Sequence, residues 1–247
     1  MKFNKFLLII SLIPALASVA IAGIAGYTDN GKKFFSKGHP KSFGYNVEIK
    51  YPSNWIATEG IRPHVVQNFK NGKGSICTLI INKIVSEPFS PVEWEDVAKE
   101  DFGEDWKNFM TSAFPNGKII GDMDIVHTKY DGNPGVLAEF EVMNTQRAGL
   151  NIYTYNVHHM FFYKDSLFSL QCATGGFSEK NIKEQIPQVY ALFRLMGNDI
   201  VLHDRYNSSP VSTARNNSNN TASKIGWIIG LCIIFIYDFF KKKSKSS

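Results

Sequence analysis

Cysteines and histidines are the side chains of this sequence with the most reactive chemistry. Cys77 and Cys172 fall in predicted strands, where they either form a disulfide or remain two buried thiols. Cys232 lies in an apolar run near the C-terminus. His158 and His159 are neighbours in a predicted strand, so their side chains face opposite ways and are poorly placed to share a metal ion. We therefore expect no metal centre and no cofactor.

A row of carboxylates marks the segment 91–114. It opens with Ser90-Pro91-Val92-Glu93, the pattern of a capping box with proline at the first helical position. Apolar residues then recur at spacings of three and four, and the opposite helix face is acidic. Such a face is either a solvated surface or a docking surface for a basic partner. The candidate partner-binding residues are Glu93, Asp96, Glu100, Asp101 and Glu104.

Motifs that would support catalysis do not stand out. Gly72-Lys73-Gly74 lacks the following helix of a phosphate-binding loop, and no serine elbow appears. An apolar strand offers the thiol of Cys172 no activating base. We expect a protein that is not an enzyme.

Charge is unevenly distributed along the 247 residues, whose formal net charge is +5. Residues 1–43 carry six lysines and one aspartate, and residues 204–247 carry seven basic and two acidic residues. The middle, 44–203, carries 14 basic and 19 acidic residues. A nucleic-acid-binding domain needs positive charge on its folded surface, so this distribution argues against nucleic acid as a partner.

The N-terminus has the pattern of an export signal. Two lysines precede an uncharged run from Phe6 to Gly26, and Ala20-Ile21-Ala22 fits the small-x-small cleavage pattern. The run is also long enough to span a bilayer. Residues 1–26 are therefore either a cleaved signal peptide or a retained anchor.

A second apolar run covers residues 225–240 and is interrupted only by Asp238. The basic tail 241–247 follows it, and an Asn/Ser-rich linker, 204–224, precedes it. We expect a transmembrane helix with its lysines in the cytoplasm. The protein would then cross a bacterial cell membrane once, or twice if the N-terminal run is retained. The folded part would lie outside the cytoplasm.

One domain remains, residues 44–203, preceded by a lead segment, 27–43. Period-two patterns and turn residues predict an α+β domain, with an antiparallel sheet of about six or seven strands covered by two main helices. Asn71-Gly72-Lys73-Gly74 predicts a hairpin. The predicted strands are 45–51, 55–59, 65–69, 76–85, 119–130, 136–143, 150–163 and 166–173, and the predicted helices are 91–114 and 177–196.

Several stretches resemble the PsbP-like family, named for an extrinsic photosystem II subunit that shares its fold with a small nuclear-transport factor. They are Gly44-Tyr45 leading into Tyr51-Pro52-Ser53-Asn54-Trp55, Ser90-Pro91 followed by Trp94, the hairpin 159–168, and the closing helix ending at 191–196. The similarity covers about residues 44–200. It implies an accessory or binding role, and it brings no catalytic residues. Unlike lipid-anchored members, this chain has no lipobox cysteine near its signal.

These observations lead to one expected function and two rivals. We expect a non-enzymatic, membrane-tethered accessory or binding domain of a bacterial envelope, with the membrane contacted through 225–240 and a protein partner that has a basic surface. The first rival is an immunity-type inhibitor of a secreted toxin, and the second is an enzyme of unknown class.

Overall fold

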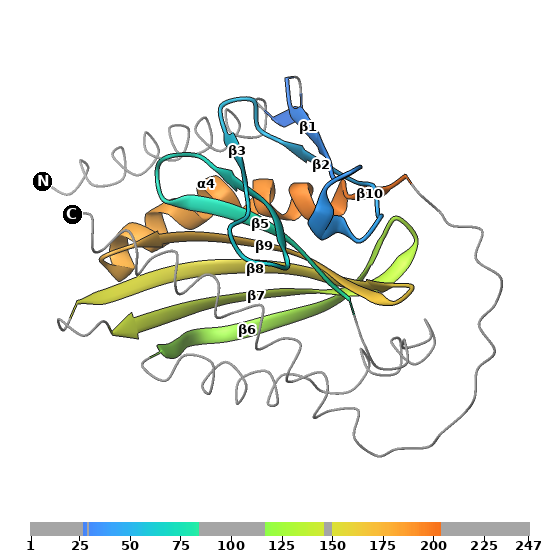
Figure 1. Cartoon of the computed structure of the whole chain (residues 1–247). Coiled ribbons are helices and arrows are strands. Elements are labelled where there is room, and N and C mark those ends of the chain that lie inside the picture. The colour runs from blue at the N-terminus through green and yellow to red at the C-terminus, as the bar shows by residue number, and fades with distance from the viewer. Residues whose placement is uncertain (1–26, 29, 84–116, 146–149, 204–247) are drawn as a thin grey trace, which may run out of the picture.

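The computed structural model describes residues 27–28, 30–83, 117–145 and 150–203 (Figure 1). Ten strands, one α-helix and one short 3-10 helix make up these ranges. Their bounds are β1 (Lys32–Phe35), η1 (Pro40–Ser42), β2 (Val47–Tyr51), β3 (Ile56–Glu59), β4 (Val65–Lys70), β5 (Ser75–Lys83), β6 (Gly117–Tyr130), β7 (Asn133–Thr145), β8 (Asn151–Tyr163), β9 (Ser166–Gly176), α4 (Glu179–Asn198) and β10 (Val201–Leu202).

Seven strands form one antiparallel sheet in the order β3-β4-β5-β9-β8-β7-β6. The α+β class and the antiparallel sheet are thus confirmed. The hairpin expected at Asn71 joins β4 to β5, where the Asn71 side chain accepts hydrogen bonds from the backbone amides of Lys73 and Ser75. Another tight turn joins β6 to β7, where both Asp131 and Gly132 have positive φ angles (47° and 81°), the backbone of a type I′ turn.

Helix α4 lies across one face of this sheet (Figure 1). Ser178 caps its start, because its hydroxyl accepts a hydrogen bond from the backbone amide of Asn181. The inward residues Ile182, Val189 and Phe193 are buried, as the spacing predicts. Trp55 is also buried and meets the ring of Phe193 edge to face.

A close approach fixes the C-terminal half of α4 on β8. A Cβ atom placed on Gly197 would lie 2.1 Å from the ring of His159, so only glycine lets the helix come this near. The ring cannot step aside, because Nε2 lies 2.9 Å from the carbonyl oxygen of Phe193 and Nδ1 lies 3.0 Å from the hydroxyl of Tyr130. Helix and sheet are therefore locked together at this point.

A second, smaller sheet has the order β1-β2-β10 and was not expected from the sequence. Its strand β1 falls in the expected lead segment, and β10 follows α4 directly. The inner face of this small sheet, with Val47, Ile49 and Leu202, joins the hydrophobic core. The small sheet and α4 thus lie on the same side of the large sheet (Figure 1).

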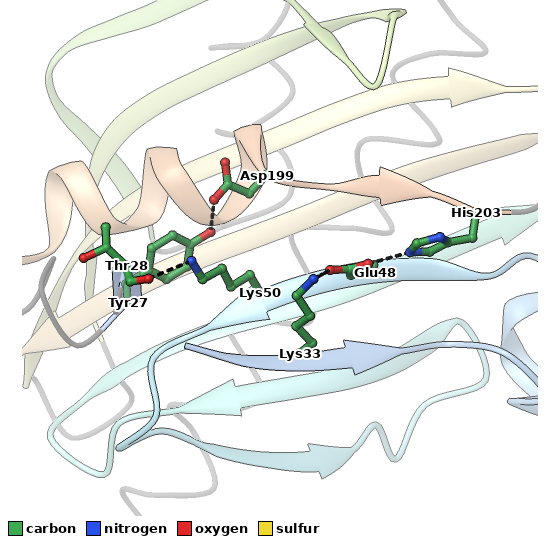
Figure 2. Close-up of polar contacts among 7 residues, drawn as sticks. All are labelled: Tyr27, Thr28, Lys33, Glu48, Lys50, Asp199 and His203. Atoms are coloured by element: carbon green, nitrogen blue, oxygen red, sulfur yellow. Dashed lines mark hydrogen bonds and ion pairs between the residues drawn. The ribbon is translucent and has the colours of Figure 1, made fainter. Parts of the chain in front are cut away.

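Both ends of the described chain are held at the small sheet (Figure 2). The hydroxyl of Tyr27 donates to Asp199 Oδ2 (2.7 Å) just after α4, and Lys50 of β2 lies over the Tyr27 ring. At the other end, His203 contacts Glu48 of β2 at 2.5 Å.

Three predicted elements lie outside the described residues: the N-terminal apolar run, the helix 91–114 and the C-terminal apolar run. The structure therefore describes one of the two main helices expected over the sheet. Within the described part of the chain, no helix is both long and apolar enough to cross a membrane.

Candidate functional site

The acidic residues singled out for partner binding, Glu93, Asp96, Glu100, Asp101 and Glu104, fall outside the described ranges. Their role stays a prediction.

The histidine pair behaves as the strand geometry predicts. His159 faces α4 and His158 faces the other side of the sheet, and both are fully buried. Nε2 of His159 carries the proton, because its partner, the Phe193 carbonyl, can only accept a hydrogen bond. Nδ1 of the neutral ring is then an acceptor for the hydroxyl of Tyr130. Burial lowers the pKa of His159 to about 4, so this network is neutral at ordinary pH.

His158 belongs to a group of buried polar side chains without hydrogen-bond partners. Both of its ring nitrogens, both amide atoms of Gln171 and the hydroxyl of Ser169 are unpartnered. Gln171 lies directly opposite His158 in the pairing of β8 with β9. Burial lowers the pKa of His158 to about 3, so the ring is neutral here too. No group of three or more metal-ligating side chains occurs among the described residues.

A different cluster combines charge with aromatic surface where α4 meets β7. This α4–β7 border consists of Glu139, Glu141, Tyr155, Tyr190 and Arg194. Arg194 Nε donates to Glu139 Oε1, and the guanidinium lies 4.6 Å from the centre of the Tyr190 ring. Glu139 and Glu141 are two residues apart on β7, so their side chains share a sheet face.

Tyr155 of β8 lies in the middle of the α4–β7 border. Its side chain is 6% exposed, and its hydroxyl has no hydrogen-bond partner. Burial raises the pKa of Tyr155, and the negative charges of Glu139 and Glu141 raise it further, so the hydroxyl stays protonated. A buried hydroxyl without a partner costs about 1–3 kcal/mol.

Glu141 is the carboxylate of the α4–β7 border that can receive a cation. Burial raises its pKa, and the charge of nearby Lys183 opposes that rise only in part. Lys183 itself is held by Glu179 at 2.5 Å on the same helix. An incoming ammonium or guanidinium group would therefore find a poorly compensated carboxylate at Glu141.

The sequence contained a signal for this cluster that our prediction did not use. Apolar and polar residues alternate along strand 136–143. Glu139 and Glu141 lie on the same face of this strand as the buried Leu137. Carboxylates where alternation expects apolar residues mark either a buried ion pair or a binding site. The partner of Glu139 comes from α4, 55 residues away, which spacing alone could not reveal.

The sequence left open whether Cys77 and Cys172 form a disulfide or remain free thiols. In the structure they form a disulfide. Cys77 of β5 lies directly opposite Cys172 of β9, and their Cα atoms are 4.0 Å apart. Both residues are fully buried, with the sulfur of Met196 on α4 lying 3.7 Å from that of Cys77. The bond therefore joins two central strands under the helix.

The sequence matches no protein-family model and no curated protein. Similar solved structures include PsbP from the cyanobacterium Synechocystis, with 17% identity over 64% of this chain and 86% of that one and a TM-score of 0.44. LpqN of Mycobacterium tuberculosis, described as involved in cell envelope biogenesis, is 10% identical over 70% of this chain and 92% of its own (TM-score 0.41). The Ran-binding protein Mog1p of Saccharomyces cerevisiae is 10% identical over 71% of this chain and 96% of its own (TM-score 0.40).

A PsbP structure is thus among those to which this chain is similar, as the sequence resemblance predicted. These likenesses concern the fold alone. They are no evidence of a shared activity.

Proposed function

We propose that this chain is a non-enzymatic accessory domain, tethered to a bacterial cell membrane and exposed outside the cytoplasm, that binds a protein partner with a basic surface. The observation that carries the binding role is the α4–β7 border. There, two carboxylates of one sheet face, of which Glu141 is poorly compensated, lie in the same cluster as Arg194 and the exposed ring of Tyr190.

Two features support the location. Apolar runs with adjacent lysines occur at both ends of the sequence, and the lysines would stay in the cytoplasm. The disulfide between Cys77 and Cys172 fits an oxidising compartment, because cytosolic thiols are kept reduced. The folded residues between the runs would then lie on the outer side.

The location is tested with reporter fusions. A phosphatase that is active only outside the cytoplasm should be active when fused after Tyr206 and inactive when fused after Ser247. The reverse pattern would contradict the proposed topology.

The binding role is tested by capture of a partner on the detergent-solubilised full chain. Glu141→Lys should reduce partner recovery severalfold, because it places a cation where the partner's cation would bind. Glu184→Lys is the matched control, since Glu184 is an exposed residue of α4 whose carboxylate lies 3.9 Å from the ammonium group of Lys180. Capture by the unmodified chain should weaken with salt.

The predicted acidic helix is tested in the same assay. Reversing Glu100, Asp101 and Glu104 to lysine should abolish capture if that helix also contacts the partner. Recovery that is insensitive to Glu141→Lys, to the triple reversal and to salt would refute recognition of a basic partner.

A further inference from the structure

The outer face of the small sheet combines exposed apolar side chains with lysines. Directly paired residues of an antiparallel sheet share a face, so Phe35, Glu48 and Val201 form one row across β1, β2 and β10. Lys33 and Lys50 form the next row. Phe35 is 47% exposed and Val201 is 37% exposed.

Glu48 is the acidic side chain of this outer face, and both of its carboxylate oxygens contact nitrogen-bearing side chains. Lys33 Nζ lies 2.6 Å from one of its oxygens, and His203 Nε2 lies 2.5 Å from the other (Figure 2). The hydrogen bond from Lys33 lowers the pKa of Glu48, and His203 lowers it further. The carboxylate is 8% exposed, so it presents little negative charge to an approaching surface.

Positive charge is concentrated around the same face. Residues 30–50 contain five lysines and one glutamate, although the domain from 44 to 203 is acidic overall. Lys37 is exposed just beyond the end of β1, whereas Lys32, also exposed, pairs with Tyr51 on the opposite face. Aromatic and aliphatic groups among lysines suit the boundary between lipid headgroups and acyl chains, where the apolar groups enter and the ammonium groups meet phosphates.

Both ends of the described chain contact side chains of this face. Tyr27, held by Asp199 and Lys50, follows directly after the apolar run that ends at Gly26. His203, held by Glu48, directly precedes the 21-residue linker to the C-terminal apolar run. A flexible linker of that length spans about 25 Å. Whether or not the N-terminal run is cleaved, the sequence leading to the membrane leaves the domain here.

From these observations we infer that the outer face of the small sheet lies against the membrane and binds the headgroups of anionic phospholipids. This inference rests on the proposed membrane tether, and it assigns the domain an orientation. The acidic α4–β7 border is built from other elements, and it stays free for a partner.

The test uses the full chain with Cys232→Ser, reconstituted in vesicles of three parts phosphatidylcholine to one part phosphatidylglycerol. A bimane label at Phe35→Cys should be quenched strongly by nitroxide-headgroup lipid. The matched control is a label at Val126→Cys on β6, since Val126 is 46% exposed, close to the 47% of Phe35. Quenching at Val126 should be at least severalfold weaker.

Charge reversal separates headgroup binding from simple proximity. Lys37→Glu should lower quenching at position 35, because a headgroup-bound lysine contributes roughly a fivefold preference for the apposed orientation. Lys129→Glu, an equal change at an exposed position of β6, should leave it unaltered. With the lysines unmodified, vesicles of phosphatidylcholine alone should give weaker quenching at position 35 than vesicles that contain phosphatidylglycerol.

The two proposals fail in different ways. A chain that does not remain with the vesicles after alkaline extraction would refute the tether, and the inferred orientation with it. A chain that remains in the vesicles but shows equal quenching at positions 35 and 126 would overturn the orientation alone. Strong quenching at position 35 that changes neither with lipid charge nor with Lys37→Glu would overturn the binding of anionic headgroups.

Discussion

Acidification should destabilise this domain well above the pH at which carboxylates titrate. His158 and His159 are fully buried, and burial lowers their pKa values from 6.5 to about 3 and about 4. As the pH falls through about 6.5, these two histidines each bind a proton in the unfolded chain. In the folded chain they stay neutral until the pH approaches about 4. The stabilisation is fully present above 6.5 and is lost progressively as the pH falls toward the folded values.

The magnitude follows from the shifts. Between about pH 8 and pH 5, each histidine lowers the free energy of unfolding by about 2 kcal/mol, so the pair accounts for about 4 kcal/mol. His64 acts in the same direction, because burial lowers its pKa too. Glu141 acts in the opposite direction, because burial raises its pKa. Glu48, whose pKa is lowered, loses its contribution only at more acidic pH.

The assay is urea unfolding of the detergent-solubilised full chain across this pH range, followed by tryptophan fluorescence. His158→Leu should remove about half of the pH dependence. It should cost little at about pH 8, because it also removes two unpartnered ring nitrogens. His127→Leu, at an exposed position of β6, is the control and should leave the dependence intact. A free energy of unfolding that stays level from about pH 8 to pH 5 would show that these histidines are charged or hydrated in the fold.

Three further predictions concern the core. Trp55→Ala should cost about 3–5 kcal/mol of stability in the same unfolding assay, as truncation of a buried aromatic does. Gly197→Ala should cost about 3 kcal/mol or more, because its methyl group would lie 2.1 Å from the immobile ring of His159. Replacing Cys77 and Cys172 together by alanine should cost about 2–5 kcal/mol, because it frees a loop with a sequence separation of 95 residues in the unfolded state.

Each of these three predictions can be checked by a control or contradicted by a stated result. Gly176→Ala should be nearly neutral, since the nearest atom to an added Cβ is 3.5 Å away, an ordinary contact. An unaltered melting temperature of the Trp55 variant would mean that the indole is displayed rather than buried. Reductant should lower the stability of the parent chain toward that of the double cysteine variant, and no response to reductant would contradict the bond.

The sequence was informative wherever structure is local. Strands 119–130, 136–143 and 166–173 and the helix after Phe177 were predicted close to their observed bounds, because alternation, turn residues and caps lie within a few positions of one another. The small sheet was missed for the opposite reason. Strand β1 reads KKFF, without alternation, and β10 has two residues. Their pairing with β2 depends on tertiary contacts that no short window contains.

The candidate site also combines a local sequence pattern with tertiary contacts that the sequence does not show. Glu139 and Glu141 occupy positions of their strand where the alternation predicts apolar residues. Tyr155 joins them through the pairing of β7 with β8, and Arg194 and Tyr190 join them only through the docking of α4. A disulfide between Cys77 and Cys172 was one of two open alternatives. The register of β5 and β9, which brings these residues opposite each other, could not be read from spacing.

The bond between β5 and β9 has a consequence for proteolysis. The sequence between Cys77 and Cys172 includes β6, β7, β8 and the segment 84–116. A single cut by a protease anywhere between the two cysteines leaves two fragments that remain covalently joined through their sulfurs. On an electrophoresis gel, such a nicked molecule would run as one species until a thiol reagent released its halves. If residues 225–240 span a membrane as proposed, the C-terminal fragment would keep its N-terminal companion attached to that membrane.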